Sequence, residues 1–404
     1  MRKNLNAAVI ITLILAILSV AVSANHNKNQ RDKVEATEAI SANTVATTDE
    51  ELEEMRGMWV SYISLDMSGT NYSEKSFREK FAKIINTAKE YGCNSLFVHV
   101  RAFCDALYKS EFFPSSHILW GQQGASESYD ALKIMCDECE KEKLQLHAWI
   151  NPYRVTNDVS AFELSKDNPY TKDNTIGIEY DNVVYLNPAN RNARELIVNG
   201  VKEIIENYNV DGIHFDDYFY PTSDESFDKA DYNTYLKSCQ SERDAMPLTA
   251  WRMNNVNMLV SEVYRTIKAY NPRIDFGISP QGNIQNDYFM GADVKSWAEN
   301  VGYVDYICPQ LYYSLENPAL KFQAGLESWL EFDFHNDLKL YAGLAVYKAG
   351  TEADEGTWQN QSDILSKELE ITRENGLDRY ILYDYEAVIS ENAKAEMSSF
   401  KESI

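Results

Sequence analysis

Residues 211–221, with the sequence DGIHFDDYFYP, combine the residue types best suited to chemistry in this chain. A short apolar run ends in two adjacent acids, Asp216 and Asp217, and aromatic residues and a proline follow. Carboxylates can protonate a glycosidic oxygen or stabilise an oxocarbenium-like centre, and aromatic rings stack on sugar faces. An Asp-Asp pair taken alone is more often an acidic turn at the end of a strand. The organisation of the rest of the chain therefore decides how this pair is interpreted.

Strand-like and helix-like segments alternate along residues 53–404. Apolar runs without strict alternation are typical of parallel strands buried on both faces. Eight strand–helix units predict an α/β fold, a (β/α)8 TIM barrel with long decorated βα loops. A doubly wound open sheet is the competing fold, but no glycine-rich phosphate loop follows the first strand to support it. The predicted strands are 57–62, 95–102, 145–151, 212–215, 275–279, 304–309, 339–346 and 379–383. The predicted helices are 77–91, 129–143, 190–208, 251–270, 294–300, 318–332, 358–375 and 392–399.

Polar and aromatic side chains follow the carboxyl ends of most of these strands, which is where barrels of this kind build their active sites. Each residue alone could be a helix cap or a loop hydrogen bond. Their convergence on one rim indicates a binding site, and its basic residues can bind carboxylated or acetylated sugars through paired hydrogen bonds. Long loops at 103–128, 155–185 and 222–250 are the natural builders of a cleft. The predicted substrate-binding residues are Arg101, Asn151, Arg154, Tyr218, Tyr220, Arg252, Gln281, Asn283, Gln310, Tyr312, Tyr313 and Asp384.

The two-residue period of a strand predicts different roles for the two acids. Asp216 shares a face with His214, and Asp217 shares the other face with Phe215. If Phe215 packs outward against helices, Asp216 points into the barrel mouth and Asp217 lies near the rim. We therefore predict that Asp216 is the catalytic carboxylate and Asp217 its partner. The candidates for the proton donor are Asp217, Glu386 and Asp384.

Two sets of residues could in principle bind a metal. His99, His147 and His214 lie on adjacent predicted strands, but no carboxylate spacing reinforces a site there, and packing within the barrel is the simpler interpretation. Cys136 and Cys139 have CxxC spacing but fall within a predicted helix without the second ligand pair that zinc requires. We predict no metal and no other cofactor.

The N-terminus predicts export. Residues 1–24 combine a basic start, an apolar run and small residues at Ala24, so we expect a signal peptide or a retained membrane anchor. Residues 25–52 are polar and aperiodic, which predicts a flexible linker. The barrel would then lie outside the cytoplasm, with membrane contact only through the N-terminal segment. The net charge of −24 argues against a nucleic-acid partner.

The order of several motifs over nearly all of residues 55–390 resembles the glycosyl-hydrolase-like family 10. The segments that carry this resemblance are 57–60, 99–101, 148–154, 186–188, 211–221, 251–255, 277–282 and 305–312. The resemblance implies a bacterial exported (β/α)8 protein. At least one branch of that family is a glycosidase that cleaves peptidoglycan glycan strands already stripped of their peptides.

Two looser resemblances concern the fourth strand alone. The α-amylase superfamily carries Gly-x-Arg-x-Asp there with the Asp as nucleophile, and Gly212, His214 and Asp216 match except for the arginine, whose role Arg101 could take. The family 18 chitinase motif DGxDxDxE also overlaps, but His214 replaces its second Asp and Tyr218 replaces its catalytic Glu. This replacement disfavours acetamido-assisted chitinase chemistry.

These observations predict an exported glycoside hydrolase that uses carboxylate acid/base or nucleophile chemistry. The predicted substrate is bacterial cell-wall glycan, as peptide-free peptidoglycan, or a related polysaccharide. A saccharide-binding barrel without activity and a hydrolase of α-glucans are the alternatives. The loops and strand ends alone do not decide among the three.

Overall fold

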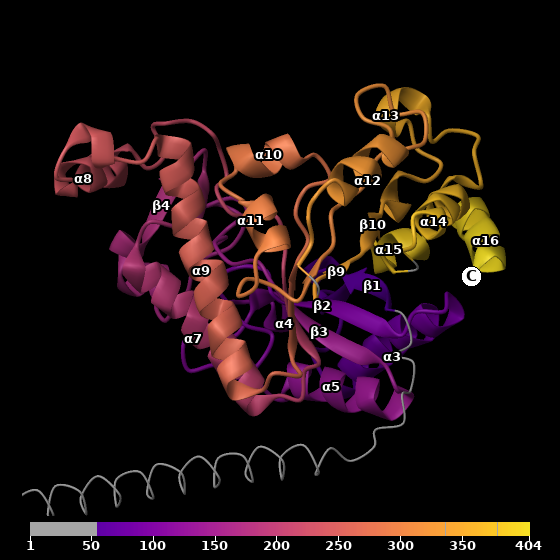
Figure 1. The fold of residues 1–404 in the computed structure, drawn as a ribbon. Helices are drawn as coiled ribbons and strands as arrows, with labels where there is room; N and C mark the ends of the chain where they lie inside the picture. Colours follow the sequence, from indigo (N-terminus) through magenta and orange to yellow (C-terminus); the bar gives the residue numbers. More distant parts are fainter. Residues whose placement is uncertain (1–54, 336, 378) are drawn as a thin grey trace, which may run out of the picture. The chain divides into compact units, whose positions relative to one another are not determined.

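The computed structural model describes residues 55–335, 337–377 and 379–404; the expected signal or anchor at 1–24 and linker at 25–52 lie outside this part. The centre of the fold is a parallel sheet (Figure 1). Its strands pair in the order β10-β11-β1-β2-β3-β6-β7-β8-β9. The strands are β1 (Arg56–Val60), β2 (Ser95–Arg101), β3 (Gln145–Ile150), β6 (Gly212–Phe215), β7 (Asp275–Ile278), β8 (Tyr306–Ile307), β9 (Lys339–Leu340), β10 (Ala342–Leu344) and β11 (Tyr380–Leu382).

The pairing of these strands runs around a barrel. β9 and β10 flank Tyr341 and together form the seventh predicted strand; β9 pairs with β8, and β10 pairs with β11. β11 in turn pairs with β1, where Arg56 lies opposite Tyr380. The predicted (β/α)8 TIM barrel is therefore confirmed.

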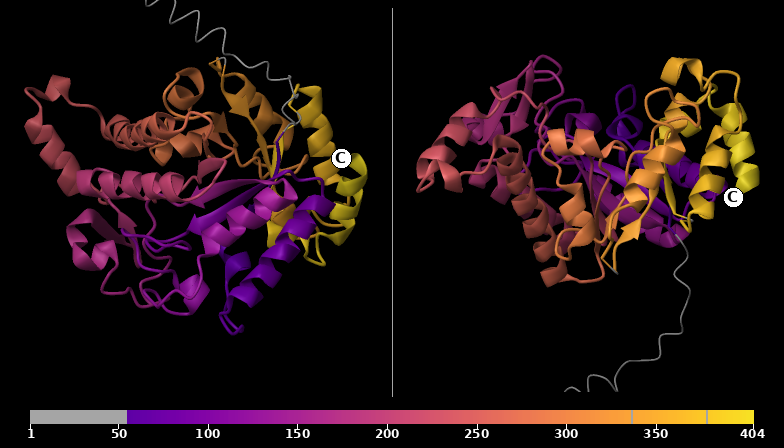
Figure 2. Two further views of the ribbon diagram at one scale, coloured as in Figure 1. Left: turned by 90° about the horizontal axis from the view of Figure 1, so that it is seen from below. Right: turned by 45° about the horizontal axis from the view of Figure 1, so that its top comes forward.

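Helices alternate with the strands and pack around the outside of the sheet (Figures 1 and 2). Their starts follow from local capping: Ser73 accepts a hydrogen bond from the Ser76 amide, and Asp130 accepts one from the Lys133 amide. The main helices are α3 (Glu74–Glu90), α5 (Ala131–Glu142), α7 (Arg191–Asn207), α9 (Leu248–Tyr270), α11 (Val294–Glu299), α12 (Phe322–Leu330), α14 (Ile364–Glu374) and α16 (Lys394–Ser403).

The loops at the carboxyl ends of the strands contain further short elements. A polar loop was expected at 155–185, but an antiparallel hairpin forms there from β4 (Gly177–Tyr180) and β5 (Val183–Leu186). Its two-residue turn has positive φ values of 52° at Asp181 and 60° at Asn182, which Asp and Asn tolerate better than most residues. The short helices are α2 (Tyr62–Leu65), α4 (His117–Trp120), α6 (Pro169–Lys172), α8 (Lys229–Ser238), α10 (Ile284–Phe289), α13 (Ala353–Gly356) and α15 (Tyr385–Val388).

Aromatic side chains fill the inside of the barrel. Trp59, Phe97, Trp149, Tyr306 and Tyr341 belong to one buried cluster, and the rings of Tyr306 and Tyr341 stack with centroids 5.0 Å apart. Rings of this size fill a barrel interior that branched aliphatic residues more often occupy. The mouth of the barrel therefore has a rigid aromatic floor.

His214 is part of this interior packing. Its Nε2 lies 3.1 Å from Trp59 Nε1, which donates to it, and its Nδ1 lies 2.9 Å from the Tyr306 hydroxyl. Burial lowers the pKa of His214 well below its usual value, so the ring is neutral. Phe215, the next residue, packs instead in the cluster between the sheet and the helices. The inward-outward alternation expected for this strand is thus present.

Among the described helices, none is both long and apolar enough to span a membrane.

Close packing inside the barrel leaves no room for a side chain at Gly277. A Cβ atom on Gly277 in β7 would overlap the ring of Tyr306. We expect Gly277→Ala to lower the free energy of unfolding by about 1–3 kcal/mol or more, measured by urea denaturation. Gly325→Ala is the matched control, because its Cβ would lie 3.5 Å from Leu311 in ordinary contact. Alanine also suits the α12 interior better than glycine. Equal losses for both variants would contradict the packing described.

Candidate active site

Asp216 and Asp217 follow the last residue of β6 and line a cavity of about 220 Å³ at the mouth of the barrel. Asp216 is 3% exposed, whereas Asp217 is only partly buried. The position of Asp216 is the one expected for an inward-facing residue. The cavity is lined by Trp59, Trp149, Asp216, Asp217, Tyr218, Ser279, Gln310, Tyr312, Tyr347 and Tyr383.

Three N–H groups hold the Asp216 carboxyl in place. Trp149 Nε1 and Asn151 Nδ2 donate to its Oδ2 over 3.0 and 3.2 Å, and the Tyr218 amide donates to Oδ1 over 3.3 Å. Burial, with a further contribution from the Asp217 charge, raises the pKa of Asp216 to about 7. Asp216 can therefore carry a proton near neutral pH.

Asp217 is held by Gln310, which follows β8. Gln310 Nε2 donates to Asp217 Oδ1 over 3.0 Å and also to the Ser279 carbonyl over 3.0 Å. Burial raises the pKa of Asp217 as well, and the hydrogen bonds from Gln310 and Gln281 oppose that shift. Two neighbouring carboxyl groups with raised pKa values form a coupled acid pair.

A third acid lies behind Gln281. Asp287 in α10 is buried, and its Oδ1 accepts a hydrogen bond from the Gln281 amide over 2.9 Å. Burial raises its pKa well above the usual value, and the Asp217 charge adds to the shift. Asn283, the other residue predicted in this loop, caps α10 by accepting from the Gln285 amide. This loop is thus fixed by its own hydrogen bonds.

Arg154 lies on one side of the acid pair. Its guanidinium carbon is 4.9 Å from the centre of the Tyr218 ring and 5.0 Å from that of Phe103, and its Nε donates to the Ala102 carbonyl over 3.2 Å. Its positive charge lowers the pKa of Asp216 against the larger effect of burial. Tyr218 itself is 49% exposed at the rim.

Several predicted binding residues have their polar atoms occupied by the protein itself. Arg101 is 1% exposed and donates to the Asn151 and Pro152 carbonyls, with its guanidinium 4.8 Å from the Phe113 ring. These hydrogen bonds stabilise the loop after β3. Tyr313 packs beside Gly282, outside the cavity lining.

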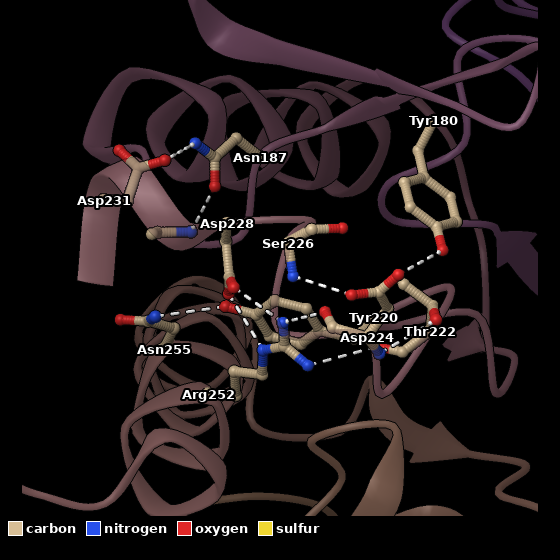
Figure 3. A network of polar contacts seen from close by, with 11 residues as sticks. Tyr180, Asn187, Tyr220, Thr222, Asp224, Ser226, Asp228, Asp231, Arg252 and Asn255 are labelled. Atoms are coloured by element: carbon tan, nitrogen blue, oxygen red, sulfur yellow. Dashed lines mark hydrogen bonds and ion pairs between the residues drawn. The ribbon is translucent and has the colours of Figure 1, made fainter. Parts of the chain in front are cut away.

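Tyr220 and Arg252 belong to a separate network shown in Figure 3. Arg252 forms an ion pair of 2.6 Å with Asp228, and its guanidinium carbon lies 5.0 Å from the centre of the Tyr220 ring. The Tyr220 hydroxyl accepts a hydrogen bond from Asn255 over 3.1 Å. This network ties the 222–250 loop to α9.

The acids after β11 also lie outside the cavity lining. Asp384 is buried and caps α15, where it accepts a hydrogen bond from the Ala387 amide over 3.2 Å. Glu386 is exposed in the first turn of the same helix. The structure therefore brings Asp216, Asp217, Tyr218, Gln310 and Tyr312 together in the cavity lining and leaves Glu386 and Asp384 outside it.

Sequence reasoning predicted Tyr218 and Tyr312 but overlooked three other rings of the cavity wall. Trp59, Trp149 and Tyr383 line the cavity together with Ser279. Trp59 and Trp149 occupy inward positions of β1 and β3, and Tyr383 directly follows β11. The same period-two argument that was applied to Asp216 would have found them.

Neither of the two sets of possible metal ligands forms a site. Within the described part of the chain, no three His, Cys, Asp or Glu side chains are grouped as metal ligands. His99 stacks on Trp149 with ring centroids 3.8 Å apart, and His147 Nδ1 lies 3.1 Å from the Tyr306 hydroxyl. Cys136 and Cys139 are buried in α5 as free thiols.

Comparison with known proteins decides the family. A family model described as glycosyl hydrolase-like 10 matches residues 54–360. The chain belongs to this family. The glycosyl hydrolase YngK of Bacillus subtilis (strain 168) is 33% identical over 347 residues, covering 79% of this chain and 67% of that protein. The glycosyl hydrolase DigH of Escherichia coli (strain K12) is 29% identical over 364 residues, covering 81% of this chain and 81% of that protein.

Solved structures with low sequence identity share the fold with this family member. The glycoside hydrolase domain of PgaB (BpsB) from Bordetella bronchiseptica has a TM-score of 0.55 at 11% identity, covering 86% of this chain and 99% of that one. An α-amylase from Geobacillus thermoleovorans has a TM-score of 0.51 at 12% identity, covering 86% of this chain and 77% of that one. Both comparisons support the barrel.

The buried Asp216 carboxyl should make stability depend on pH. Its pKa is about 7 in the folded protein against an ordinary value of 3.8, so the folded state holds the proton more tightly and its stability falls as the pH rises from 4 to 7. Asp216→Asn carries no charge at this position. Its free energy of unfolding, measured by urea denaturation at pH 8, should exceed that of the wild type by on the order of 4 kcal/mol. That advantage should vanish at pH 4. A variant that is equally destabilised at both pH values would contradict the assigned pKa.

Proposed function

We propose that this protein is an exported glycoside hydrolase that cleaves glycosidic bonds in peptide-free peptidoglycan strands. The observation that carries the proposal is the acid pair Asp216 and Asp217 in a ring-lined cavity at the carboxyl ends of the barrel strands. An acid pair that holds a proton near neutral pH can give it to a leaving oxygen. Membership of the glycosyl hydrolase-like 10 family supports the same reaction class.

The walls of the cavity suit a sugar ring. Trp59, Trp149, Tyr312 and Tyr383 surround the acids with aromatic faces, and Tyr347 stands 45% exposed at the rim. Aromatic faces bind the C–H faces of sugars, while a few polar groups fix the orientation of the hydroxyls. Gln310, Ser279 and the tyrosine hydroxyls are neutral polar groups among the lining residues.

Three observations favour a cell-wall glycan over other polysaccharides. Arg154 lies close enough to influence the Asp216 carboxyl, and an arginine can bind the carboxylate that muramic acid carries. The resemblance to a family branch that acts on peptide-free glycan strands points the same way. The expected export segment at 1–24 would bring the enzyme to that glycan.

Loss of either acid should stop hydrolysis. We expect Asp216→Asn and Asp217→Asn to lower the rate of reducing-end release from peptide-free strands by about 10²–10⁴-fold, the usual contribution of a general acid or base. The measurement is a reducing-sugar assay on the full chain, with circular dichroism to verify folding.

Asp337→Asn is the matched control, because Asp337 is exposed just before β9, at the amino end of a strand. This variant should keep wild-type activity. Full activity in either cavity variant, or binding of strands without release of product by the wild type, would contradict the proposal; the second result would indicate a saccharide-binding barrel.

A further inference from the structure

Both acids of the cavity stand on the same wall. Asp216 and Asp217 are consecutive residues at the end of β6. With β9 and β10 counted as one strand, the strand order places β11 directly across the barrel from β6 and β1 beside β11. Those two strands bring Tyr383 and Trp59 to the cavity. The wall that faces the acid pair is therefore aromatic.

The nearest acids on the opposite side are engaged elsewhere. Asp384 caps α15 through the Ala387 amide, and Glu386 is exposed outside the cavity lining. Of the residues that line the cavity, Asp216 and Asp217 are the ones with carboxyl groups. A sugar bound between the walls thus meets carboxyl groups from one direction only.

This one-sided arrangement conflicts with hydrolysis by two opposed carboxylates. A retaining glycosidase with a protein nucleophile places its carboxyl groups on the two sides of the scissile bond, about 5–5.5 Å apart, and an inverting enzyme separates them by about 6.5–9.5 Å to admit water. In both schemes one carboxylate attacks, or activates water, from the face opposite the leaving group. The aromatic wall supplies no such group.

We propose that the nucleophile is the 2-acetamido group of the substrate itself, so that the site accepts a β-linked 2-acetamido sugar at the cleavage position. The inference rests on the proposed function and names the sugar and the route of that reaction. Peptide-free peptidoglycan consists of such sugars, whereas glucans lack the acetamido group. The proposal therefore separates the cell-wall substrate from the α-glucan alternative.

The depth of the two acids assigns their roles. Asp216 is the deeper group and is oriented by Trp149 and Asn151, so it accepts the N–H of the acetamido group and turns the acetamido oxygen toward C1. Asp217 is nearer the rim and is oriented by Gln310, so it faces the glycosidic oxygen. An N–H bound to Asp216 favours its charged form and leaves the proton of the pair on Asp217.

The bond changes balance in two steps. The acetamido carbonyl oxygen forms a bond to C1 while the bond from C1 to the glycosidic oxygen breaks, and Asp217 gives its proton to that oxygen. The sugar becomes a cyclic oxazolinium ion whose N–H stays on Asp216. Asp217 then takes a proton from water, the water oxygen bonds to C1, and the ring opens to restore the acetamido group. The anomeric configuration is retained.

The fourth-strand sequence disfavoured acetamido chemistry because Tyr218 stands where a chitinase has its catalytic glutamate. The structure offers another proton donor. Asp217 lines the same cavity as Asp216, so the donor can be the next residue along the chain rather than one two positions away. Tyr218 is left to form part of the rim beside Arg154.

The test uses the thiazoline derived from N-acetylglucosamine, a stable sulfur analogue of the cyclic intermediate. We expect isothermal calorimetry on the full chain to show that it binds at least about 100-fold more tightly than N-acetylglucosamine. Asp216→Asn should weaken thiazoline binding by about tenfold or more, because it exchanges a charged acceptor for a neutral one. Asp217→Asn should keep thiazoline binding within a few-fold while losing hydrolysis, and Asp337→Asn should match the wild type.

Proton NMR of the first product from peptide-free strands supplies the second readout, with the β-anomer expected. Thiazoline binding no tighter than that of N-acetylglucosamine, or release of the α-anomer, would overturn this inference. If the protein still hydrolysed the strands, the proposed function would stand. Tight, Asp216-dependent thiazoline binding without cleavage of the strands would support the inference and contradict the proposed substrate. Because calorimetry measures binding without turnover, failure of this inference can be distinguished from failure of the proposed function.

Discussion

The withdrawal of two neighbouring carboxyl groups from water at the end of β6 is the constraint on which the rest of the site depends. Burial raises the pKa of both acids, and the negative charge of Asp217 raises that of Asp216 further. Leaving such groups without hydrogen bonds would cost several kcal/mol, so the residues that donate to them are needed to stabilise the site. Trp149 and Asn151 satisfy Asp216, and Gln310 satisfies Asp217. The result is a pair that retains a proton at pH values where exposed aspartates are ionised.

The aromatic interior of the barrel makes this arrangement rigid. Trp59 donates to His214 from below the cavity, and Trp149 contributes both a ring to the wall and an N–H to Asp216. Side chains that pack in a barrel core and also reach the site hold the reacting groups to a fraction of an ångström, and such precision carries much of an enzyme's rate. The same rings present flat apolar faces to a sugar. Stability and recognition thus depend on the same residues here.

Much of this organisation is readable from the sequence because it depends on local patterns. Apolar runs, helix caps and strand ends locate the barrel and place Asp216, Asn151 and Gln310 at one rim. The contacts of Arg101 and Arg252 are not readable in this way. Arg252 is committed to Asp228 across the 222–250 loop, and Arg101 is committed to carbonyls after β3, so each depends on the path of a loop that no short-range pattern fixes. The period-two pattern does place Trp59 and Trp149 inside the barrel, but a buried ring and a sugar platform look alike in sequence.

The protonation of the acid pair can be measured directly. Carbon-13 NMR of protein labelled at the aspartate carboxyls, titrated against pH, reports each pKa, and the resonance absent from Asp216→Asn identifies that group. We expect this carboxyl to titrate at about 7. A value below about 5, in the ordinary range of aspartates, would show that Asp216 is not withdrawn from water and does not hold a proton near neutral pH.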